Sequence, residues 1–118
     1  MLARDGRRIA PIVLVRLGRV AIGDQVARAL GADSVVILIG ERPGLTAPDS
    51  MGAYLTWNPG PHTTDAERNC ISNIRPDGTG YADAALRIGH LLREMRTRRL
   101  SGVALKDSSD RTQAIRVD

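Results

Sequence analysis

The stretch Ser34-Val35-Val36-Ile37-Leu38-Ile39-Gly40 decides the fold class that this sequence predicts. It is a continuous apolar run rich in β-branched residues, which is typical of a strand buried on both faces of a parallel sheet. A shorter apolar run spans residues 11–15, and apolar residues recur at helical spacing from Ile22 to a C-capping Gly31. Strand, helix and strand within about 30 residues form a βαβ unit. The sequence therefore predicts an α/β domain with a parallel sheet.

Further elements follow this unit. Residues 51–57 alternate apolar and polar side chains and predict a third strand, which the Asn-Pro-Gly-Pro sequence at 58–61 ends. Thr64 and Glu67 have capping-box spacing and predict a short helix that carries Cys70 and Ile71.

After a turn at residues 76–80, apolar residues at helical spacing predict a long helix from Ala84 to about Arg99. Residues 103–105 are a candidate for a last short strand. Acid-before-base spacing predicts three i,i+4 ion pairs along the helices, namely Asp24–Arg28, Asp83–Arg87 and Glu94–Arg98.

Length and composition limit the classes of protein that remain. The chain has 118 residues, which suits a single domain over 1–118, with 1–10 and 108–118 expected to be flexible ends. Its one cysteine excludes an internal disulfide and a cysteine-based zinc cluster within the chain. The longest apolar run is far too short for a membrane span, and charged residues occupy the region where a secretory signal is apolar. We expect no metal site and no membrane association.

The charge balance raises a second function class. The formal net charge is +4, and all but one of the 17 basic residues are arginine. A basic α/β module that contacts nucleic acid or another anionic partner through the arginines at 93–99 is therefore an alternative. Only Tyr54, Trp57 and Tyr81 are aromatic, which is a small supply of stacking platforms for bases. Arginines near a helix C-terminus also stabilise the helix itself.

Catalytic signatures are missing from the sequence. It contains no dinucleotide-binding glycine pattern, no phosphate-binding loop lysine, no nucleophile elbow and no zinc-protease histidine pair. His62 lies in a proline-rich loop and His90 in the predicted long helix, and neither has a nearby carboxylate pattern. We therefore predict no catalytic residue in this chain.

Two segments stand out as candidates for ligand contact. Residues 40–45, Gly-Glu-Arg-Pro-Gly-Leu, leave the most buried predicted strand at its carboxyl end, where ligands bind in open α/β sheets. Residues 68–76, Arg-Asn-Cys-Ile-Ser-Asn-Ile-Arg-Pro, hold a high density of hydrogen-bonding side chains. On pattern alone, a stable turn is an equally good interpretation of the first segment, and a capped helix end with a small buried Cys70 is slightly favoured for the second.

Four blocks together resemble the small (light) subunit of ethanolamine ammonia-lyase, in its C-terminal cobalamin-binding domain. They are residues 14–24, 40–45, 68–75 and 101–106, and they occur in the family's order and near its spacing. The resemblance covers about residues 11–107.

The resemblance implies a Rossmann-like three-layer α/β domain with a mostly parallel sheet. It implies an adenosylcobalamin-dependent carbon–nitrogen lyase that converts ethanolamine to acetaldehyde and ammonia. The large subunit, a β/α barrel, is expected to carry the chemistry. This chain is expected to help bind the cofactor at the interface of a hetero-oligomer. The resemblance implies a cytoplasmic location, either free or enclosed in a bacterial microcompartment.

Three positions match the family's cobalamin contacts. The resemblance implies that Val20 offers an apolar or backbone contact, that Glu41 accepts hydrogen bonds from the cofactor, and that Cys70 lines its pocket. Further candidates in the same blocks are Arg42, Asn69, Ser72 and Asn73. Family members carry a substantial region before this domain, whereas here only about ten residues precede the first predicted strand. A fragment, a truncated reading frame and a degenerate paralogue are the interpretations of that difference.

Overall fold

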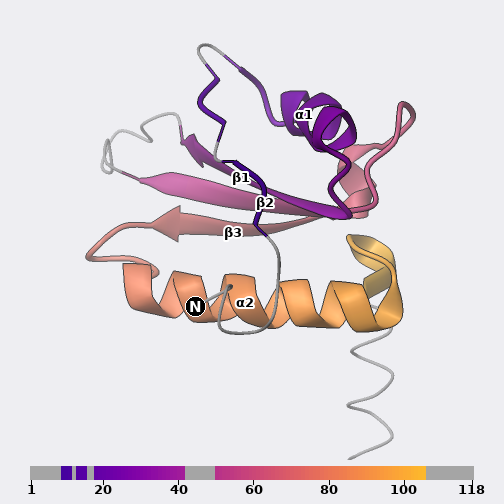
Figure 1. Cartoon of the computed structure of the whole chain (residues 1–118). Helices are drawn as coiled ribbons and strands as arrows, with labels where there is room; N and C mark the ends of the chain where they lie inside the picture. The colour runs from indigo at the N-terminus through magenta and orange to yellow at the C-terminus, as the bar shows by residue number, and fades with distance from the viewer. Residues whose placement is uncertain (1–8, 12, 16–17, 42–49, 106–118) are drawn as a thin grey trace, which may run out of the picture.

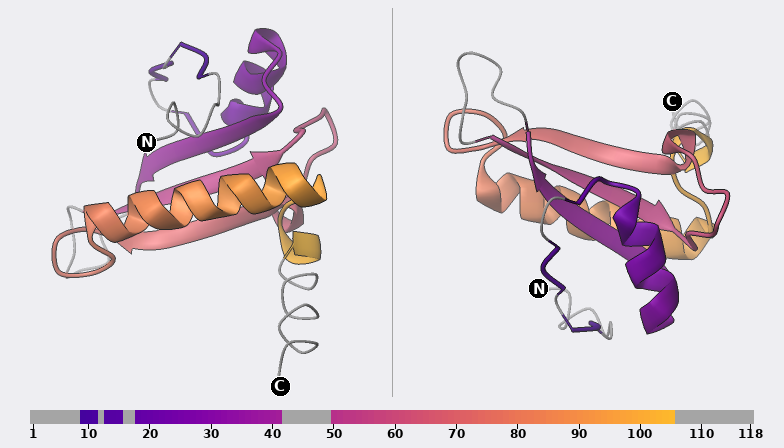
Figure 2. Two further views of the ribbon diagram at one scale, coloured as in Figure 1. Left: turned by 60° about the horizontal axis from the view of Figure 1, so that its bottom comes forward. Right: turned by 90° about the horizontal axis from the view of Figure 1, so that it is seen from above.

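The computed structural model describes residues 9–11, 13–15, 18–41 and 50–105. Its elements, in chain order, are α1 (Ile22–Leu30), β1 (Ser34–Gly40), β2 (Met51–Trp57), the short 3-10 helix η2 (Asp65–Glu67), β3 (Arg68–Ile74) and α2 (Tyr81–Arg98). The sheet lies between the two α-helices: α2 runs along one face, and α1 lies over the other (Figures 1 and 2). Among the described helices, none has the length and apolar character needed to cross a membrane.

The sheet is antiparallel throughout, with the strand order β1-β2-β3. The predicted Rossmann-like, mostly parallel sheet is therefore wrong, and so is the βαβ unit. Gly40 at the end of β1 faces Met51 at the start of β2. Only residues 41–50 join these strands, which is too short for the crossover of a dozen or more residues that a parallel pair requires.

The apolar run at 34–40 does form a strand, but not a central one. Within the described sheet, β1 pairs only with β2 and is an edge strand. Val35 and Ile37 face Gly23 of α1, whereas Leu38 on the opposite face is 58% exposed. A helix over one face therefore accounts for the apolar character that suggested a parallel sheet.

The main core lies between the sheet and α2. Its fully buried members come from β2, β3, α2 and the segment that follows α2; the largest are Leu55, Ile74, Met95 and Leu105. The predicted long helix is confirmed, as are its ion pairs Asp83–Arg87 at 3.5 Å and Glu94–Arg98 at 2.8 Å. Gly31 also ends α1 as predicted, with a left-handed φ of 66°.

Three predicted elements are wrong. Of residues 11–15, those that the structure describes form no strand, and Leu14 is 93% exposed. An apolar run becomes a strand only when another strand pairs with it, and β1 accepts no such partner in the described sheet. Residues 103–105 are helical rather than extended, because the N–H of Leu105 bonds back to the carbonyl of Gly102 at 3.1 Å.

The third error concerns Cys70. The capping box of Thr64 and Glu67 is present as predicted, but it opens only the 3-10 turn η2. Residues 68–74 then form β3 and pair with β2. The amide, thiol, hydroxyl and β-branched side chains of this segment favour helix only weakly, so backbone pairing decides its structure. Of the ends predicted to be flexible, 1–10 and 108–118, only residues 9 and 10 are among the described residues.

Candidate functional site

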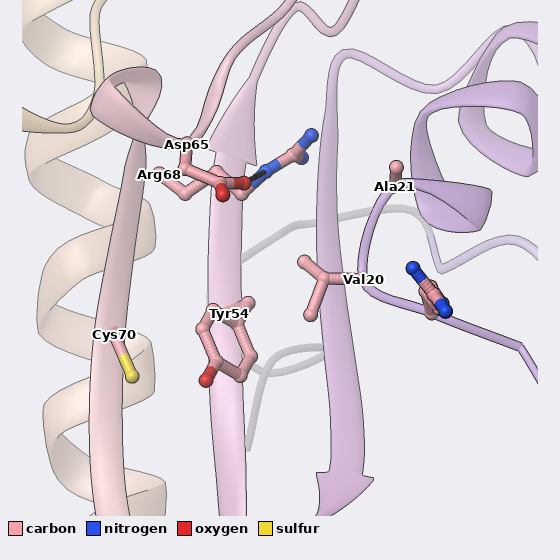
Figure 3. A pocket seen from close by; sticks show the side chains of 7 residues that line it. Val20, Ala21, Tyr54, Asp65, Arg68 and Cys70 are labelled. Atoms are coloured by element: carbon pink, nitrogen blue, oxygen red, sulfur yellow. Dashed lines mark hydrogen bonds and ion pairs between the residues drawn. The ribbon is translucent and has the colours of Figure 1, made fainter.

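The sheet face opposite α2 carries a cavity. In the strand register, Tyr54 of β2 lies opposite Cys70 of β3, and Thr56 lies opposite Arg68, so these side chains form two adjacent rows. The cavity has a volume of about 440 Å³, and Figure 3 shows how strand residues and the start of α1 surround it. Its lining residues are Arg19, Val20, Ala21, Tyr54, Asp65, Arg68 and Cys70.

A buried ion pair fixes α1 over this face. The guanidinium of Arg68 donates to both carboxylate oxygens of Asp24, at 2.7 and 2.8 Å, and also to the hydroxyl of Thr56 at 3.1 Å. The Arg68 side chain is only 4% exposed. The hydrogen bond to Asp24 raises the pKa of Arg68 above its ordinary value, so the guanidinium stays charged. The pair holds α1, and with it the preceding Val20, beside the strands.

Asp24 was predicted to pair with Arg28, and that prediction is wrong. Asp24 is buried and points toward the sheet, where it meets Arg68. The i,i+4 rule describes exposed helix faces, whereas a buried carboxylate takes the partner that its tertiary surroundings offer.

A close approach between α1 and β1 completes this packing. A Cβ on Gly23 would lie 1.9 Å from Cδ1 and 2.6 Å from Cγ1 of Ile37. No side chain larger than hydrogen fits there without a shift of Ile37. Gly23 therefore sets the height of α1 above the sheet and so the depth at which Val20 lies.

Tyr54 and Cys70 form a cross-strand pair on the floor of the cavity (Figure 3). Their side chains are neighbours across the two strands, and the pKa of Tyr54 is raised above its ordinary value of 10.0. The main cause is charge repulsion from Cys70, followed by the close approach of its side chain and by burial. At neutral pH the phenol is therefore protonated and can both donate and accept a hydrogen bond.

Glu41 lies just beyond β1 and is not among the cavity-lining residues. Its Oε1 accepts a hydrogen bond from the Ser50 hydroxyl at 2.5 Å and another from the backbone N–H of Asn73 at 2.8 Å. These bonds tie the ends of all three strands together at one end of the sheet. Glu41 thus has a structural role that the sequence did not reveal.

The other candidates lie apart from the cavity. Asn69 exchanges hydrogen bonds with the backbone of Gly102, accepting at 2.6 Å and donating at 3.3 Å. Asn73 has a left-handed φ of 56° at the end of β3, and Ser72 beside it is exposed. Arg42 and the rest of its loop through Leu45 lie outside the described residues.

The two histidines are separated. His62 is exposed in its loop, and His90 lines a second groove between β3 and α2. Across the part of the chain that the structure describes, no group of three or more His, Cys, Asp or Glu side chains is arranged to hold a metal ion.

The cavity combines polar and apolar side chains in its lining. Charged and hydroxyl groups from Arg19, Asp65 and Tyr54 stand beside apolar surface from Val20 and Ala21. Such a lining complements a ligand that combines an apolar body with amide groups at its rim. Tyr54 and Arg68 were not predicted as cavity residues, although the alternation along residues 51–57 puts Tyr54 on the face opposite Ala53 and Leu55.

The structure is thus a small α/β domain with a cavity on one face of an antiparallel sheet. Comparison with known proteins then gives its family. The model of the ethanolamine ammonia-lyase light chain family (EutC) matches residues 1–106, and the chain belongs to that family.

Similar proteins agree with this assignment. The chain is 57% identical over 109 residues to an ethanolamine ammonia-lyase small subunit from Xanthomonas campestris, covering 92% of this chain and 40% of that protein. Small subunits from Rhodopseudomonas palustris and Azotobacter vinelandii are 56% and 55% identical, over 92% of this chain and 41% and 40% of theirs. The chain thus spans about two-fifths of the length of the relatives it matches.

Proposed function

We propose that this chain binds adenosylcobalamin as part of an ethanolamine ammonia-lyase, at an interface with the large subunit. One observation carries the proposal. Val20 and Cys70, far apart in the sequence and both implied as cofactor contacts by the family resemblance, line the same cavity. Antiparallel pairing and the Asp24–Arg68 ion pair bring them together.

The chemistry of the cavity supports a cobalamin ligand. Cobalamin carries amide groups around an apolar macrocycle, and the cavity offers both hydrogen-bonding and apolar side chains. A volume of about 440 Å³ holds one part of so large a cofactor and leaves the remainder to the partner subunit. When bound, the cofactor supplies the radical chemistry, and the residues of this chain bind and orient it.

We also propose that Glu41 contacts the cofactor, and the charge of its carboxylate is the feature to test. Its Oε1 already accepts two hydrogen bonds within the chain, so removal of the whole side chain would disturb the strand ends as well. Glu41→Gln retains an acceptor oxygen for Ser50 and Asn73 and removes only the charge. We expect this variant to fold normally and to bind cofactor more weakly than the unchanged chain.

The test is co-expression with a matching large subunit, followed by measurement of adenosylcobalamin affinity and of ethanolamine-dependent acetaldehyde release. Val20→Glu places a charge in the cavity, and we expect a loss of cofactor affinity of about tenfold or more. The matched control is Val103→Glu, because Val103 is 57% exposed and does not line the cavity. Equal affinity for the two variants, or activity that is the same without this chain, would refute the proposal.

A further inference from the structure

Tyr54 lies among the three residues that the family resemblance marks as cofactor contacts. It faces Cys70 across the β2–β3 pair and shares the cavity lining with Val20 (Figure 3). Glu41 approaches it from the end of the sheet. The Tyr54 ring and the Glu41 side chain both lie within 3.7 Å of the point where a Cβ on Gly52 would stand. Tyr54 is thus the residue that connects the two parts of the proposed site.

Gly52 determines how the tyrosine ring lies. Gly52 and Tyr54 are two residues apart on one strand, so they share a sheet face. A Cβ on Gly52 would come within 3.3 Å of Cε2 of Tyr54, which is a tight contact. Because Gly52 has no side chain, the ring can lie along β2 over it rather than standing upright.

Cys70 also lies beside Tyr54, as its cross-strand neighbour on the same face of the sheet (Figure 3). A tyrosine bounded by Gly52 along its own strand and by Cys70 on the next strand presents a flat apolar surface and a hydroxyl at little entropic cost.

We propose that Tyr54 is a direct ligand contact of this cavity. Its ring packs against the apolar body of cobalamin, and its hydroxyl bonds to an amide at the rim of the cofactor. Cys70 positions the tyrosine side chain. The inference rests on the proposed function. It changes the role of Cys70 from a lining residue to a positioning residue. It also names the aromatic contact that the sequence pattern left unassigned.

The experiment measures adenosylcobalamin affinity of the complex with the large subunit. We expect Tyr54→Phe to weaken binding by about 3- to 10-fold, because it removes one hydrogen bond. We expect Tyr54→Leu to weaken it by about 10- to 100-fold, because the ring is lost too. Cys70→Ser keeps a side chain of similar size beside Tyr54 and should bind within about threefold of the unchanged chain. Tyr81→Phe is the control, since Tyr81 lies on α2 outside the cavity and is 55% exposed.

A second readout needs no cofactor. The chain has two tyrosines, so Tyr81→Phe leaves Tyr54 as the single tyrosine whose ionisation is followed by near-ultraviolet absorbance. In that variant the pKa of Tyr54 should lie above 10.0, and adding Cys70→Ala should lower it toward that value.

The outcomes separate the two proposals. If the unchanged complex binds cofactor and Tyr54→Leu binds it equally well, Tyr54 is no contact, and the proposed function stands without it. An unshifted titration after Cys70→Ala would refute the positioning role of Cys70. If the unchanged complex binds no cobalamin, both proposals fall, whatever the titration gives.

Discussion

At the scale of single residues, Gly102 combines a left-handed backbone with close backbone neighbours. Its φ is +77°, and a Cβ there would lie 2.0 Å from the carbonyl oxygen of Ala66, in the turn before β3. Its neighbour Ser101 accepts the N–H of Trp57 at 2.9 Å and donates to the carbonyl of Glu67 at 2.5 Å. Together these residues fasten the segment after α2 to the loop between β2 and β3.

We expect Gly102→Ala to destabilise the fold by roughly 2–4 kcal/mol, because the left-handed backbone and the backbone contact both oppose a methyl group. Denaturant unfolding followed by circular dichroism measures the change. Gly60→Ala is the matched control, because a Cβ there meets nothing within 4 Å and φ is not positive. Similar losses in the two variants would contradict this account.

Tyr54 makes a prediction about pH. Its pKa is raised in the folded chain, so between 10.0 and that higher value the folded state retains a proton that the unfolded state has released. Folding stability therefore falls as pH rises from about 10 upward through this window. The difference in unfolding free energy between the unchanged chain and Tyr54→Phe should shrink over that pH range and stay constant below it. A relative stability that rises with pH would contradict the assignment.

At the scale of elements, the contact between α1 and β1 depends on one glycine. Gly23→Ala would ordinarily strengthen a helix by about 0.5–1 kcal/mol, but here the new methyl group meets Ile37. We expect the single variant to be destabilised by about 1–3 kcal/mol through overpacking.

A second substitution tests the cause. Ile37→Ala removes both atoms closest to the new methyl group and leaves Val35 at an ordinary 3.5 Å. In the Ile37→Ala background, Gly23→Ala should therefore be neutral or stabilising. A double-mutant cycle on unfolding free energies measures this reversal, and simple additivity would show that α1 does not pack on β1 in this way.

Among the elements, the helices and strands differed in how well sequence predicted them. Both α-helices were predicted from apolar periodicity, and Gly31 ended α1 as expected. The residues of β1 and β2 were also found. The direction of their pairing was not, because it depends on the connection between the strands rather than on the residues within them. For β3, capping residues suggested a helix, and tertiary pairing overrode that local preference.

The candidate site was harder to predict for the same physical reason. Val20 and Cys70 could be named from the family's motifs, but nothing local to either predicts that they share a cavity. That arrangement depends on an ion pair between Asp24 and Arg68, which lie 44 residues apart. The i,i+4 spacing rule instead predicted Arg28 as the partner of Asp24.

At the scale of the whole molecule, the fold exposes apolar surface. Leu14, Leu38 and Leu86 are each more than half exposed, and the chain spans about two-fifths of its relatives' length. If this surface meets the large subunit, binding should stabilise the folded chain by mass action.

We expect the melting temperature of this chain to rise when the large subunit is added, and to rise further with adenosylcobalamin. Hydrogen exchange of the chain with and without its partner would locate the protected strands. Unchanged exchange would contradict the proposed interface.

The single cysteine of this chain has a practical consequence. Cys70 is exposed, and it is the only thiol that the sequence contains. A thiol-selective reagent can therefore label the protein at one position, and that position lines the proposed binding cavity. The labelling rate reports where a ligand binds. A ligand seated beside Tyr54, or in the second groove that Cys70 also lines, shields the sulfur, and one bound away from both leaves its reactivity unchanged.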